Sequence, residues 1–67
     1  MEWKEWKGKR IFVQLKSGGV YSGEVINVDD ADKPIVFFEI LDKFGEKVTF
    51  VASEIIKIKE ENKDAGH

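Results

Sequence analysis

The chain lacks cysteine altogether and has a single histidine, His67, and a single proline among its 67 residues. Without cysteine there are no disulfide bonds, and one terminal histidine cannot supply the ligand set of a zinc site. No apolar run approaches the ~20 residues of a membrane-spanning helix, and the charged N-terminus has no apolar segment like that of a signal peptide. We therefore expect an intracellular, cytoplasmic protein that contacts no membrane and uses no metal or cofactor.

A chain of 67 residues forms one domain at most. It buries only about 60% of its unfolded surface, so its margin of stability is thin. Domains this small commonly depend on disulfides, a metal or a partner subunit. Because the first two are lacking, the composition predicts that the chain associates with copies of itself.

Charge is abundant but nearly balanced, because 36% of the residues are charged and the net charge is −2. This balance is unlike that of a strongly basic nucleic-acid-binding protein. Residues 1–10 hold four basic and two acidic side chains, a net +2, whereas residues 11–67 hold seven lysines and eleven acids, a net −4. The N-terminal segment is thus the candidate face for an RNA, with a solvated amphipathic segment as the alternative. Its basic residues are Lys4, Lys7, Lys9 and Arg10.

Two tryptophans, Trp3 and Trp6, lie three residues apart in this segment. The spacing puts both indoles on one face of a short helix over residues 1–7, which Gly8 ends. So short a helix must dock through its tryptophans. They either anchor the helix to the rest of the domain or stack on bases. Tyr21, an aromatic residue in an expected strand, is interpreted as packing.

Alternating apolar and polar residues after Arg10 predict about five short antiparallel strands. The turn Ser17-Gly18-Gly19 supplies positive φ angles for a tight hairpin, and Gly23 is interpreted as a corner in the next strand. The fold class is therefore all-β: a small, strongly bent five-stranded sheet or barrel of the SH3 type, with a short N-terminal helix. This domain covers residues 1–59, and residues 60–67 are expected to be a disordered tail. The expected strands span residues 10–16, 20–28, 35–41, 46–51 and 55–59.

Three segments carry more detailed expectations. Residues 29–33 are polar and predict a loop, and residues 52–54 predict an abrupt turn through one helical turn. Residues 35–41 are apolar on both faces, so this strand is central, and its second face needs cover from the helix or from a neighbouring subunit. In the last strand, Ile56 and Ile58 are expected on one face, opposite Lys57 and Lys59.

The first hairpin resembles the first motif of the Sm/Lsm family, the small RNA-associated barrels that include bacterial Hfq. The motif is a hydrophobic-x-Leu-x-x-Gly segment, four residues, Gly-x-hydrophobic, three residues and Asp. The resemblance spans about residues 3–59, and other SH3-like barrels share part of this pattern. It implies a homo-oligomeric ring in which the fourth strand of one subunit pairs with the fifth strand of the next. The matching residues are Val13, Leu15, Gly18, Gly23, Val25 and Asp29.

The chain departs from the family at the residues that bind RNA. Ala31 stands where the family has a base-stacking side chain, and Lys33 stands where it has a base-reading Asn. Val51-Ala52 or Ala52-Ser53 replaces the Arg-Gly pair of the second motif. By the resemblance, Asp29 shapes the loop and Lys33 meets a phosphate. The RNA-binding family positions are Asp29, Ala31, Asp32, Lys33, Ala52 and Ser53.

The sequence does not predict an enzyme, because its serines have no histidine partner in the folded region. The acidic run at residues 29–32 lacks the glycine and glutamate of a calcium loop, so no metal site is expected. The leading prediction is an Sm-like ring that binds single-stranded RNA through an atypical nucleotide pocket. The alternatives are a protein-interaction or scaffold ring that binds no RNA, and a monomeric SH3-like module that binds peptides.

Overall fold

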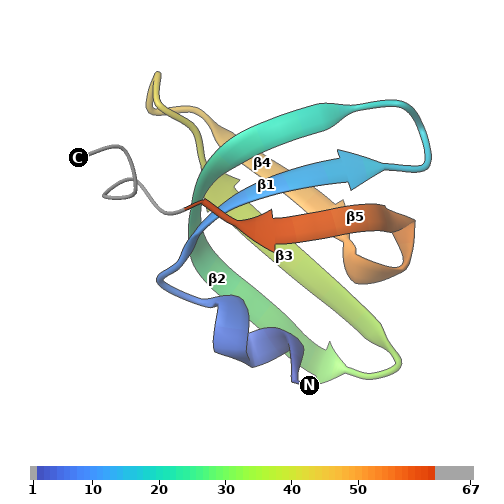
Figure 1. Cartoon of the computed structure of the whole chain (residues 1–67). Helices are drawn as coiled ribbons and strands as arrows, with labels where there is room; N and C mark the ends of the chain where they lie inside the picture. The colour runs from blue at the N-terminus through green and yellow to red at the C-terminus, as the bar shows by residue number, and fades with distance from the viewer. Residues whose placement is uncertain (1, 62–67) are drawn as a thin grey trace.

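The computed structural model describes residues 2–61 and places five antiparallel strands in one sheet of order β4-β3-β2-β1-β5. The predicted all-β class and the number of strands are confirmed (Figure 1). β4 and β5 are the two outer strands of the sheet. The elements are the 3₁₀ helix η1 (Trp3–Trp6), β1 (Arg10–Leu15), β2 (Val20–Asp32), β3 (Ile35–Leu41), β4 (Lys47–Val51), the 3₁₀ helix η2 (Ala52–Glu54) and β5 (Ile55–Glu60).

The N-terminal helix is shorter than expected: a four-residue 3₁₀ helix, Trp3–Trp6, replaces the helix predicted over residues 1–7. Its backbone bonds run from Glu5 N to Glu2 O and from Lys7 N to Lys4 O, both 3.1 Å long. Residues three apart are aligned in a 3₁₀ helix, so both tryptophans still share one face.

β2 is longer than expected, because residues 29–32 continue the strand where a loop was predicted. Asp29 is paired with Phe37 and Asp32 with Ile35, with a register shift between the two pairs. At this irregularity the Asp29 Oδ1 atom accepts a hydrogen bond of 3.0 Å from the Ala31 amide. The long apolar strand β3 thus holds the polar segment in the sheet through its backbone.

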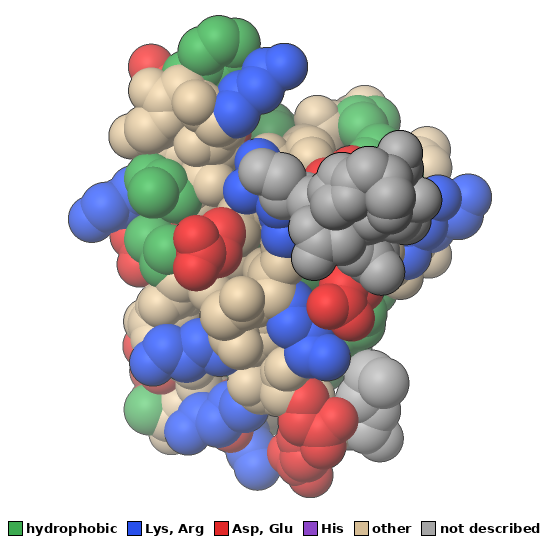
Figure 2. Space-filling view, turned by 60° about the vertical axis from the view of Figure 1, so that its left-hand side comes forward, with side chains coloured by type: hydrophobic (Ala, Val, Ile, Leu, Met, Phe, Trp, Pro, Cys, Tyr) green, Lys and Arg blue, Asp and Glu red, His purple; other side chains and the backbone are tan. Residues whose placement is uncertain are grey.

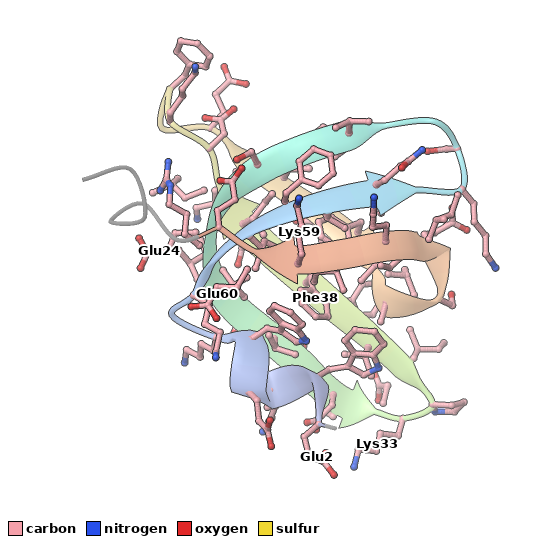
Figure 3. The ribbon with its side chains drawn as sticks, in the orientation of Figure 1. Glu2, Glu24, Lys33, Phe38, Lys59 and Glu60 are labelled. Atoms are coloured by element: carbon pink, nitrogen blue, oxygen red, sulfur yellow. The ribbon has the colours of Figure 1, made fainter. Side chains whose placement is uncertain are left out.

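The core lies between the two halves of the bent sheet, where side chains of β1 meet those of β3. Phe38, which is fully buried, lies near its centre (Figure 3). β3 lies inside the sheet between β2 and β4, as expected. Its second face remains exposed in the described part of the chain, with Ile35 at 48% and Phe37 at 40% of full exposure. The buried hydrophobic residues are Ile11, Val13, Leu15, Val25, Val28, Val36, Phe38, Ile40, Phe50 and Ala52.

The prediction for β5 was wrong at Ile56, which is 60% exposed instead of sharing a buried face with Ile58. The cause is a register shift at Leu15, which is paired with Ile55, whereas Val13 is paired with Ile58. Ile55 and Ile58 therefore pack against the core. β5 also extends to Glu60, the first residue of the expected tail; residues 62–67 of that tail lie outside the described residues.

Gly23 allows a close approach between β2 and the end of β3. A Cβ atom at this position would strike the backbone carbonyl of Leu41 and lie 3.1 Å from the Asp42 Cα atom. Both neighbours are backbone atoms, which cannot rotate away as a side chain can. The missing side chain therefore fixes the β3–β4 turn beside β2.

Candidate functional site

The family positions for RNA binding lie at one end of the sheet, in two groups. Asp29 is paired with Phe37, which is paired with Val51, so the end of β2 and the start of η2 lie on one row across three strands. Ala31, Asp32, Lys33 and Ser53 are exposed there. The fold therefore places at one end of the sheet the residues that the motif had grouped.

Ala52 differs from the other family positions, because its side chain is part of the core and only 7% exposed. Ser53 is the exposed residue of the η2 turn. Asp29 was expected to shape a loop, but it lies within β2, where its Oδ1 atom accepts a hydrogen bond from the Ala31 amide. No aromatic ring occupies position 31, so the end of β2 has no base-stacking residue of the kind the family uses there.

The positive charge of the lysines near the end of β2 is partly balanced by one acidic residue, Asp30. The Lys4 Nζ atom lies 3.4 Å from Asp30 Oδ1, and the Lys33 Nζ atom lies 3.9 Å from Asp30 Oδ2. Both lysines are largely exposed, so each pair contributes little stability, about 0–1 kcal/mol. The pairs nevertheless reduce the positive charge that Lys33 offers to a phosphate.

The expected basic face at the N-terminus is likewise mixed in sign. The Lys9 Nζ atom lies 3.5 Å from Glu60 Oε1, and Lys4 forms the pair with Asp30 described above. Lys7 is exposed. Figure 2 shows blue basic side chains beside red acidic ones on the face that it presents. The fourth residue, Arg10, begins β1 and faces away from the buried Ile11.

The two tryptophans serve as anchors. The Trp3 ring contacts Phe38 edge to face, with centroids 5.5 Å apart. Trp6 packs against the core cluster, and its Nε1 atom is buried without an acceptor among residues 2–61. Of the two interpretations left open by the sequence, these contacts favour anchoring over base stacking.

A second set of cations lies on the outer face of β1 and β5, and we call Arg10, Phe12, Lys57 and Lys59 the β1–β5 strip. Phe12 is paired with Lys59 across the two strands, and the Lys59 Nζ atom lies 5.9 Å from the centre of the Phe12 ring. Lys57 is paired with Gln14 and projects from the same face. None of the three cations forms an ion pair within residues 2–61. Figure 3 labels Lys59 on β5.

A groove of about 260 Å³ lies beside the start of β2, at the end of β3 opposite to the family positions. Its far wall is the β3–β4 turn, at the upper left of Figure 1. The Asp42 Oδ1 atom orders this turn by accepting hydrogen bonds of 2.9 Å from the amides of Phe44 and Glu46. We call it the β2–turn groove; its lining residues are Arg10, Val20, Tyr21, Ser22, Asp42, Lys43 and Phe44.

Two aromatic rings belong to the β2–turn groove. Phe44 is 80% exposed, and the Lys43 Nζ atom lies 5.5 Å from its ring centre. Tyr21 lies against Gly19, where an added Cβ atom would approach the Tyr21 Cε2 atom to 2.8 Å. Tyr21 was predicted to pack within the sheet, and no binding role was predicted for Phe44. An aromatic residue beside a lysine at a turn was the available signal for a binding surface.

Two further features are lacking among the described residues. Within residues 2–61, no three acidic or histidine side chains come together to hold a metal ion. Neither short helix of this region is long and apolar enough to cross a membrane. Comparisons of the chain with family models, with curated proteins and with solved structures found no match.

Proposed function

We propose that the chain is a subunit of an Sm-like homo-oligomeric ring that binds single-stranded RNA. The positions of β4 and β5 at the two edges of the sheet carry the assembly part of this proposal. An outer strand has backbone donors and acceptors on one side that no strand of its own chain satisfies. Pairing β4 of one copy with β5 of the next satisfies both edges, and a closed ring leaves none free.

Exposed apolar side chains beside these edges support the same assembly. Ile35 and Phe37 are exposed on the outer face of β3, and Val51 of β4 is half-buried beside Phe37. Ile56 is exposed on β5. Burial of apolar surface against a neighbouring copy would stabilise the ring by roughly 25 cal/mol per Å². A domain with so small a core gains most from such a contact.

Single-stranded RNA is the ligand favoured by the cations of the β1–β5 strip and by the half-buried Phe12 ring beside them. Proteins bind single strands without sequence preference by combining a positive track with aromatic faces. The β1–β5 strip offers Lys57, Lys59 and Arg10 around Phe12. These cations have no ion-pair partner in the described region, whereas Lys4, Lys9 and Lys33 have one.

Native mass spectrometry with and without RNA tests both parts together. We expect a mass that is a multiple of 7.7 kDa and an added oligo-U mass that disappears as salt rises, because phosphate contacts release counterions. Phe37→Lys should yield monomers by placing a charge in the contact, whereas Ser17→Lys, in the exposed β1–β2 turn, should leave the ring intact. Monomers of the unaltered chain would contradict the ring and favour a peptide-binding module.

A scaffold ring that binds no RNA is the second candidate, and the family positions favour it. Ala52 is buried, Ala31 offers no ring, and Asp30 partly balances Lys33. A ring that takes up neither oligo-U nor RNA of mixed sequence at low salt would support this candidate. The same result would contradict the RNA part of the first proposal.

A further inference from the structure

We propose that the β2–turn groove is the nucleotide site of this protein: one base stacks on Phe44, and its phosphate binds Arg10 and Lys43. This inference rests on the RNA-binding part of the proposed function. It places the site at the end of β3 away from the loop that the family resemblance indicates.

Phe44 carries the first step. A phenylalanine that is 80% exposed contributes little to the core, yet Asp42 holds the Phe44 backbone in place through the hydrogen bond to its amide. An exposed ring on an ordered turn offers a flat face to a base. Stacking of this kind is sequence-tolerant, because every base has a π face.

Tyr21 forms the second aromatic side of the groove. The ring lies against Gly19, so a Cβ atom at that position would push the Tyr21 side chain aside. Tyr21 as a whole is 37% exposed. Because Gly23 has no Cβ atom, the Leu41 carbonyl lies against its backbone, and the β3–β4 turn stays close to β2.

The cations supply the phosphate contacts. Arg10 and Lys43 both line the groove, and neither forms an ion pair within residues 2–61. An arginine can hold two phosphate oxygens at once through its planar fork. Two acids close to the groove accept hydrogen bonds from neutral groups and keep their negative charge: Asp42 accepts from two backbone amides, and Glu61 accepts a hydrogen bond of 2.7 Å from the Ser22 hydroxyl. Glu24 is paired with Arg10 across the strands.

The size and position of the groove fit one nucleotide within a longer strand. Its volume of about 260 Å³ is just below the roughly 300–1,000 Å³ of sites for drug-sized ligands. Arg10 belongs to both the groove and the β1–β5 strip. An RNA strand that places one base in the groove therefore continues past Lys59 and Lys57 along the outer face of β1 and β5.

Fluorescence anisotropy with labelled oligo-U of about ten nucleotides tests the site. Phe44→Ala should raise Kd about 5-fold or more by removing a stacked base, and Phe44→Trp should restore binding. Lys43→Gln should make the plot of the logarithm of the binding constant against the logarithm of the salt concentration shallower by about 0.7, because one phosphate contact is lost. Lys16→Gln, an exposed lysine in the β1–β2 turn, is the matched charge control and should change neither value. Because Phe44 is exposed, circular dichroism should show Phe44→Ala as stable as the unaltered chain.

The outcomes separate the site from the function. If the unaltered chain binds RNA, Phe44→Ala binds equally well and Lys33→Gln binds less well, the groove proposal is overturned and RNA binding stands. If the unaltered chain does not bind at low salt, both proposals fall. An oligo-dT arm tells whether RNA or DNA supplies the nucleotide, and in either arm weaker binding by Phe44→Ala supports the site.

Discussion

Trp3 and Phe38 meet edge to face, with ring centroids 5.5 Å apart and ring planes at 83°. Phe38 also stacks on Phe50, again at 5.5 Å between centroids. A four-residue 3₁₀ helix does not persist by itself. The tryptophans therefore hold η1 against the core. Trp3 in turn shields Phe38 from solvent.

Trp3→Ala should lower the free energy of unfolding by about 1–2 kcal/mol, since it removes apolar burial and an aromatic pair from a partly exposed position. Trp3→Phe should recover part of this loss. Urea denaturation followed by circular dichroism measures both variants. An unchanged midpoint in Trp3→Ala would show that η1 does not stabilise the domain.

Gly23→Ala should destabilise the domain by about 1–3 kcal/mol, because the added methyl group meets the Leu41 backbone. Gly19→Ala is the matched comparison: it meets only the Tyr21 ring, which can rotate away, so its cost should be smaller. Thermal unfolding of the two variants compares them. Equal stability of both would contradict the close approach of β3 to Gly23.

Asp42→Ala should lower the free energy of unfolding by about 1–2 kcal/mol, because two amides of the β3–β4 turn lose their acceptor. Asp42→Asn keeps a carbonyl oxygen in the same place and should cost less. Chemical denaturation gives the stability of each variant. If the asparagine variant is as unstable as the alanine variant, the carboxylate acts through its charge instead of through these two hydrogen bonds.

Most of the fold could be predicted because the strands follow simple alternation. Ile11, Val13 and Leu15 are buried at every second position, as their spacing indicates. The errors fall where tertiary pairing overrides local pattern. Residues 29–32 look like a loop, yet β3 supplies backbone partners that keep them in β2. Ile56 follows the alternation in sequence, yet a register shift beside Leu15 turns it outward.

The candidate site was harder to predict, because its residues are distant in sequence and ordinary in type. Arg10, Tyr21 and Phe44 belong to a strand start, a strand and a turn, and only the bend of the sheet brings them to one groove. The family positions were easier to find, since they follow a motif. Burial of Ala52 could not be read from that motif, because it depends on how η2 packs under β3.

The pairing of β1 with β5 has a consequence for how the protein is made. Ile11 is paired with Glu60, so the first and last strands of the sheet are neighbours. During synthesis, one edge of β1 can pair with β2 early, whereas its other edge stays open until β5, the last strand of the domain, has left the ribosome. Contacts between such distant segments slow folding and expose strand edges meanwhile. Charged side chains, which make up 36% of the residues, oppose edge-to-edge pairing of nascent chains until β5 emerges.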